Sequence, residues 1–121
     1  MRPPITQIDF NHLAWSDHPT LAGVQTKLVP HAGFPPDDVL LARVAPDGEI
    51  PWHVHPQQSE FAYVLSGNGE IYGKAAESDP AGDALPLATG RAVVVPPDCW
   101  HSVRNTGADD LILLALHLPT G

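Results

Sequence analysis

The amino-acid sequence predicts an all-β fold, and three observations carry that prediction. Short runs rich in β-branched and aliphatic residues alternate with turn signals from about Val39 onward. The 14 prolines and 10 glycines are spread between those runs, so they mark turns and not a disordered tract. No stretch of ten or more residues combines apolar positions at helical spacing with a cap. A β chain of this size hides its sheet edges by closing into a barrel or a double-sheet jelly roll.

The expected strands follow one another along the chain, each bounded by turn residues. They are "GVQTKLV" (23–29), "VLLARVA" (39–45), "EFAYVL" (60–65), "RAVVV" (91–95) and "LILLALHL" (111–118). Residues 73–86 are small, polar and proline-bearing, which predicts a long loop. Residues 1–20 are weakly patterned and either add an edge strand or cross to a second subunit. We expect residues 1–121 to form a single domain with one core.

Composition and charge exclude several classes of function. The net charge is −8 and the chain holds only six lysines and arginines, so we expect no nucleic-acid partner. A single cysteine, Cys99, rules out an internal disulfide. The first residues carry no apolar segment of signal-peptide length, and the longest aliphatic run, "LILLAL", is too short to span a bilayer. These features predict a cytoplasmic protein that is not embedded in a membrane.

The segment "PWHVHPQQSE" carries the strongest chemical signal. Residues two apart in an extended strand point to the same face, so His53 and His55 project together. The spacer "PQQS" favours a turn, after which Glu60 opens the next strand as a hairpin partner that can reach the same point. His101 starts a strand after the turn at "PPD" and is well placed to complete the set. Imidazoles beside a carboxylate favour a divalent transition metal (Fe, Mn, Ni, Cu or Zn) over calcium.

These residues resemble the two sequence motifs of the cupins. Residues 48–67 resemble the first motif and residues 90–105 the second. The matching positions are Gly48, His53, His55, Glu60 and Gly67, followed by Gly90, Pro96, His101 and Asn105. The sequence departs from the usual pattern in that Gly48 is one residue closer to His53 and Asp98 stands where a glycine is usual. Aspartate tolerates left-handed turn conformations, so the turn can be kept. The resemblance implies a cupin-type double-stranded β-helix, or jelly-roll barrel, with three histidines and one glutamate around a metal, often in a homodimer.

The remaining histidines and the aromatic residues give weaker signals. His12, His18 and His31 lie in poorly patterned or proline-flanked segments and are interpreted as surface groups. His117 alternates with leucines; it could line the cavity, but a satisfied or edge histidine is the commoner case. Cys99 has no activating neighbour in sequence. Arg43 is either an exposed strand residue or an anchor for an anionic substrate. Four aromatic residues flank the ligands and are either pocket wall or plain core: Trp52, Phe61, Tyr63 and Trp100. Strand alternation puts Ala62 and Val64 on the face of Glu60, and Phe61 and Tyr63 on the opposite face, outside the cavity.

A four-ligand site on an octahedral metal leaves positions open for a small-molecule substrate or for dioxygen. The sequence therefore favours a metal-dependent enzyme of the dioxygenase type acting on a small organic molecule. An alternative enzyme is a lyase or isomerase in which Glu60, the expected catalytic residue, or a nearby group moves a proton. A third reading is a non-catalytic module that binds or senses a small ligand, and a polar cluster without any metal is also compatible with the sequence.

Overall fold

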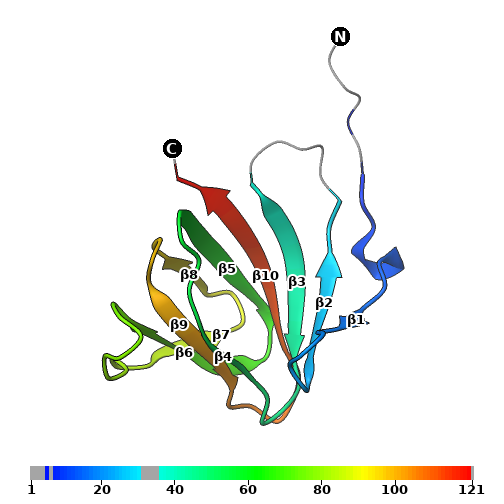
Figure 1. The fold of residues 1–121 in the computed structure, drawn as a ribbon. Coiled ribbons are helices and arrows are strands. Elements are labelled where there is room, and N and C mark those ends of the chain that lie inside the picture. The colour runs from blue at the N-terminus through cyan, green and yellow to red at the C-terminus, as the bar shows by residue number, and fades with distance from the viewer. Residues whose placement is uncertain (1–4, 6, 31–35, 121) are drawn as a thin grey trace.

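The computed structural model of the chain describes residues 5, 7–30 and 36–120, and these residues form two antiparallel sheets that face each other (Figure 1). The expected all-β fold is confirmed. The helical element of the described residues is one short 3₁₀ turn, η1. The elements are η1 Phe10–His12, β1 Ser16–Asp17, β2 Val24–Leu28, β3 Asp38–Val44, β4 Glu49–His53, β5 Gln58–Ser66, β6 Asn68–Lys74, β7 Leu85–Ala88, β8 Ala92–Val95, β9 Trp100–Asn105 and β10 Leu111–Pro119.

The strand order shows which segments meet. One sheet has the order β1-β2-β3-β10-β5-β8 and the other the order β4-β9-β6-β7. The last strand, β10, thus lies inside the larger sheet, between β3 and β5 (Figure 1). No helix among the described residues is long and apolar enough to cross a membrane.

The expected hairpin between the His-Val-His segment and the strand of Glu60 is wrong. β4 pairs with β9, whereas β5 pairs with β10 and β8 in the opposite sheet. The turn that follows His55, with Gln57 at a positive φ of 63°, carries the chain from one sheet to the other. As a result, His53 and Glu60 approach the same space from opposite walls of the barrel.

In other segments the observed strands differ from those expected from the sequence. Residues 68–74 and 85–88 form β6 and β7, so the strands take both ends of the predicted loop 73–86. Within residues 1–20, β1 pairs with β2 of the same chain, and Ser16 lies opposite Thr26. Of the two alternatives for this segment, an edge strand or a crossing to a second subunit, β1 is an edge strand. β6 was not predicted because "NGEIYGK" mixes two glycines and two charges with its apolar residues.

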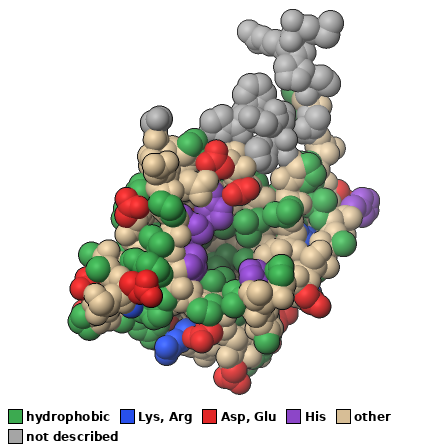
Figure 2. Space-filling model, viewed as in Figure 1, with side chains coloured by type: hydrophobic (Ala, Val, Ile, Leu, Met, Phe, Trp, Pro, Cys, Tyr) green, Lys and Arg blue, Asp and Glu red, His purple; other side chains and the backbone are tan. Residues whose placement is uncertain are grey.

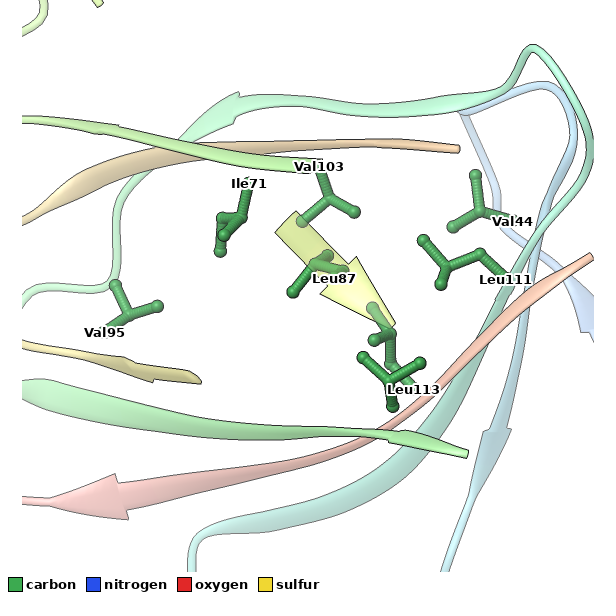
Figure 3. Packing of buried hydrophobic residues seen from close by; sticks show 8 residues of the cluster. Val44, Ile71, Leu87, Val95, Val103, Leu111 and Leu113 are labelled. Atoms are coloured by element: carbon green, nitrogen blue, oxygen red, sulfur yellow. The ribbon is translucent and has the colours of Figure 1, made fainter. Parts of the chain in front are cut away.

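Aliphatic side chains fill much of the space between the two sheets. Figure 3 shows them pointing toward one another from both sheets. As the alternation predicts, Ala62 and Val64 of β5 are buried, while Phe61 and Tyr63 lie on its other face and are half-buried. The core cluster comprises Val44, Val64, Ile71, Leu87, Val95, Val103, Leu111 and Leu113.

Two turns depend on left-handed backbone conformations. Gly67, between β5 and β6, has a φ of +92°, and a Cβ placed there would lie 2.4 Å from the carbonyl oxygen of Asp110, so only glycine fits. Asp98, in the turn before β9, has a φ of 63°. The aspartate that replaces the usual glycine therefore adopts the left-handed conformation, as expected from its tolerance of it.

Candidate metal centre

Three histidines converge at one end of the barrel. Two of them lie in strands of the smaller sheet, and the third lies in the segment that follows β4. His53 ends β4 and lies directly opposite His101 of β9, and His55 follows two residues later. The ring centroid of His101 lies 4.1 Å from that of His53 and 5.3 Å from that of His55. Each of the three rings offers one nitrogen within 4.8 Å of the others. The structure therefore brings the three predicted histidines together.

Backbone carbonyls fix the orientation of two of these rings. Nδ1 of His53 lies 2.8 Å from the oxygen of Pro51, and Nδ1 of His101 lies 2.9 Å from the oxygen of Cys99. A carbonyl only accepts, so Nδ1 carries the proton and donates in both rings, and Nε2 keeps its lone pair. Burial, the main influence, lowers the pKa of His101, which favours its neutral form.

Glu60 reaches the same point from β5 in the opposite sheet. Its Oε1 lies 3.5 Å from Nε2 of His55, and its Oε2 lies 3.7 Å from Nε2 of His101. Burial by itself would raise the pKa of Glu60, but the surrounding imidazoles of His117, His55 and His101 hold it well below its usual range. The carboxylate is therefore ionised and adds a negative charge to the histidine cluster.

His117 also lies in the site, a position that the sequence left open. It is the direct cross-strand neighbour of Glu60, and its Nε2 lies 2.7 Å from Oε1 of Glu60. Its Nδ1 lies 3.2 Å from Oδ2 of Asp38. The hydrogen bond to Glu60 is the main cause of the raised pKa of His117. His117 is satisfied, as expected, but it also lies in the site, and its strand is central in the sheet and not at an edge. One feature of the sequence could have indicated His117: it is the one polar residue in the otherwise apolar strand β10.

The chemistry of these donor atoms fits a divalent transition metal. Nε2 of His55 and Nε2 of His101 are buried and have no hydrogen-bond partner, which is costly unless something else binds them. The distances of 3.5 and 3.7 Å to Glu60 are too long for good hydrogen bonds. Neutral imidazole nitrogens beside a carboxylate form the donor set that iron, manganese, nickel, copper and zinc accept. The residues present thus fit such a metal.

Comparison with known proteins gives the family. Residues 40–117 match the family model described as the cupin domain. The chain belongs to the cupin family. The cupin is 38% identical over 78 residues to protein SchB of Streptomyces halstedii, covering 64% of this chain and 51% of that protein. It is 33% identical over 78 residues to polyketide synthase CurC of Streptomyces cyaneus, covering 64% of this chain and 46% of that protein.

The cupin spans about half the length of these curated relatives. Among solved structures, it is similar to a protein of Thermotoga maritima described as a predicted oxalate decarboxylase. That similarity has a TM-score of 0.80 at 18% identity and covers 94% of this chain and 99% of the other. At this identity the likeness supports the fold, including the jelly-roll architecture expected from the sequence.

A cavity leads from the surface of the cupin to the histidine cluster. It has a volume of about 450 Å³, and its wall includes His53, His55, Glu60 and His117. Figure 2 shows this face of the molecule hollowed, with apolar side chains inside the hollow and histidines at its border. The rest of the wall is mainly apolar and comes from Leu21, Val24, Leu40, Ala42, Ile50, Pro51 and Trp52, with Thr20, Thr26 and His18 as further polar members. An organic molecule can therefore reach the cluster along a largely apolar path.

The remaining sequence candidates divide between this cavity and the surface. Among the four aromatic residues that flank the ligands in sequence, only Trp52 is in the wall. His18 is half-buried and borders the cavity where it opens to the surface. Its Nδ1 accepts from the backbone N–H groups of Thr20 and Leu21, both at 3.2 Å, so its Nε2–H is left as a donor. His12 is exposed beside Asp9, as expected.

Arg43 and Cys99 are not among the residues that line this cavity. Arg43 lies elsewhere, with its Nε 2.9 Å from Oε1 of Gln25 and its guanidinium 4.3 Å from the ring centre of Trp15. The thiol of Cys99 is half-buried and lies 3.6 Å from the backbone oxygen of Trp100. His31 lies outside the described residues.

Proposed function

We propose that this cupin binds one divalent transition metal through His53, His55, Glu60 and His101. The unpartnered, buried Nε2 atoms of His55 and His101 are the main support, because a bound cation removes the cost of leaving them unsatisfied. The hydrogen bonds that hold Nδ1 of His53 and His101 support the same assignment, since histidine ligands commonly donate their other nitrogen to a carbonyl or carboxylate.

We further propose that the metal site is catalytic and acts on a small organic molecule, first of all in an oxidative reaction of the dioxygenase type. The observation that carries this proposal is the cavity of about 450 Å³, which opens the proposed ligands His53, His55 and Glu60 to a substrate. When bound, a metal with open positions supplies redox or Lewis-acid chemistry. The apolar wall would exclude water and orient the carbon skeleton, and Nε2–H of His18 would donate to an oxygen of the substrate.

The substrate class follows from the same wall. A largely apolar cavity with a donor at its border suits a compact carbon skeleton that carries oxygen atoms. The name of one relative, polyketide synthase CurC, is compatible with such a molecule. We therefore propose aromatic or polyketone compounds with hydroxyl or keto oxygens as the first compounds to test.

A lyase or isomerase reaction is the second candidate, and the pair of His117 and Glu60 favours it. These side chains are 2.7 Å apart and both line the cavity, so they could hold or move a proton beside a bound substrate. In that case the reaction would not need dioxygen, whereas the oxidative reaction would.

Oxygen dependence separates these proposals. The protein, purified without chelators and analysed for metal, would be incubated with the compounds above in air and under anaerobic conditions. Turnover that consumes oxygen supports the first proposal, and equal turnover without oxygen supports the second. His55→Ala should abolish either activity, while His12→Ala, which changes an exposed histidine, should not. Saturable binding without turnover would replace both proposals with a ligand-binding role.

We also propose a homodimer. The outer face of the larger sheet carries an apolar strip formed by cross-strand neighbours of β8, β5 and β10, and Val94 in this strip is 71% exposed. The strip consists of Val94, Phe61, Tyr63, Leu114 and Leu116, and a second copy would cover it. The cytoplasmic location expected from the sequence stays a prediction.

A further inference from the structure

His117 occupies the middle of a row of three side chains that crosses three adjacent strands. Its cross-strand neighbours are Asp38 on β3 and Glu60 on β5. Nδ1 lies 3.2 Å from Oδ2 of Asp38, and Nε2 lies 2.7 Å from Oε1 of Glu60. Both ring nitrogens therefore have a carboxylate partner, and the ring is held at both ends.

Two of the proposed histidine ligands differ from His117 because each has a ring nitrogen without a hydrogen-bond partner. Nε2 of His55 and Nε2 of His101 are buried without any partner, and the other nitrogen of His101 is bound to a backbone oxygen. Although His117 belongs to a second cluster with His55 and Glu60, its Nε2 is already engaged by the carboxylate. To bind a metal, His117 would have to give up that hydrogen bond. The free nitrogens of His55 and His101 are thus suited to bind a metal, whereas His117 is suited to hold Glu60.

The two oxygens of Glu60 have different surroundings. Oε1 accepts from His117 at 2.7 Å and also lies 3.5 Å from Nε2 of His55, while Oε2 has no hydrogen bond and faces Nε2 of His101 at 3.7 Å. The terminal torsion of a glutamate is soft, so a carboxylate without a partner samples many orientations. A donor fixed at Oε1 restricts it to one.

We propose that His117 is a positioning residue and not a metal ligand: Nε2–H holds Oε1 of Glu60 so that Oε2 is presented to the metal, and Asp38 holds the ring of His117 in place. This inference rests on the metal site proposed above. It assigns to Asp38, on the exposed end of the row, an indirect part in metal binding.

A double-mutant cycle tests the inference with cobalt(II) as a spectroscopic probe. The variants are His117→Ala, Glu60→Gln and the double variant, with His117→Gln as the conservative replacement. The readouts are the cobalt(II) affinity and the visible absorption spectrum of the bound ion. His12→Ala is the matched control, because His12 also faces an aspartate, Asp9, but at the surface.

We expect His117→Ala to keep one cobalt(II) per chain, to weaken its affinity by about 10- to 100-fold, and to change its spectrum. His117→Gln should restore much of the affinity, because an amide N–H can donate to Oε1 of Glu60. In the Glu60→Gln background, His117→Ala should have little further effect, since it acts through the carboxylate. Asp38→Ala should weaken binding in the same direction but less than His117→Ala.

Several results would overturn the inference. Loss of the ion in both His117 variants, to the extent seen for His55→Ala, would make His117 a ligand. Additive effects in the cycle, or an unchanged affinity and spectrum in His117→Ala, would show that it does not act through Glu60. If His117→Ala does not fold, as judged by circular dichroism, His117→Gln and Asp38→Ala decide by the same readouts. Failure of the parent protein to bind any divalent metal would overturn the proposed function itself, which is a distinct result.

Discussion

His53 and His101 are direct cross-strand neighbours in β4 and β9, with ring centroids 4.1 Å apart. In the facing sheet, Glu60 and His117 form a second cross-strand pair. The candidate site is thus built from one pair on each wall of the barrel, joined by His55 in the crossing segment. Its geometry depends on the separation of the sheets, which the aliphatic core holds constant.

Replacing Glu60 should affect activity more than metal content. In Glu60→Gln the histidines can still hold a metal, but the ion carries one more uncompensated positive charge, which changes its redox potential and the acidity of a bound water. We expect measurable metal after dialysis together with turnover reduced by an order of magnitude or more, roughly the scale of an acid–base or ligand-charge effect. Metal analysis and activity assays on the same sample check this. Full activity in Glu60→Gln would contradict the role given to the carboxylate.

The stability of the metal-free protein should be greatest near pH 6.5. The pKa of His117 is raised, so its contribution is complete below the unfolded value of 6.5 and is lost as the pH rises through the folded value. The pKa of Glu60 and that of His101 are lowered, so their contributions are present above the unfolded values of 4.5 and 6.5 and are lost as the pH falls.

Denaturant unfolding of the chelator-treated protein between about pH 5 and 9 measures this profile. The variant His117→Gln should lose most of the decline on the alkaline side, because the titrating imidazole is gone. A parent profile that keeps rising above pH 7 would show that the pair of His117 and Glu60 does not stabilise the fold.

The proposed dimer should depend on the outer face of the larger sheet. Val94→Asp puts a charge at the β8 end of the apolar strip, next to Phe61, and should convert the dimer to a monomer. Leu85→Asp is the matched control, since Leu85 is 59% exposed on β7 of the other sheet. Light scattering at micromolar concentration distinguishes the states. A monomeric parent protein, or a Val94→Asp protein that stays dimeric, would remove this claim.

The sequence predicted those features that depend on local pattern. Alternation along β5 placed Ala62 and Val64 inside and Phe61 and Tyr63 outside, and the tolerance of aspartate for left-handed backbone explained Asp98. The close spacing of His53 and His55 likewise indicated that their rings meet. Each of these inferences needs only a few neighbouring residues.

Features that depend on the pairing of distant strands were not predictable in this way. The turn after His55 reverses the chain whether it makes a hairpin or crosses between sheets, so the sequence could not exclude the wrong pairing. His117 meets Glu60, which is 57 residues earlier, only because β10 lies beside β5 in one particular register. A shift of one residue would turn the imidazole to the outer face of the sheet.

Metal content per chain tests the central claim most directly. Protein purified without chelators, or reconstituted with iron, manganese, nickel, copper or zinc, should bind one ion, and His55→Ala and His101→Ala should bind almost none, while His12→Ala binds as much as the parent. At a free metal concentration of 100 times Kd, binding should also stabilise the parent by about 2.7 kcal/mol, and neither ligand variant should gain this. Equal metal content in the parent and both ligand variants, or no metal in the reconstituted parent, would contradict the account.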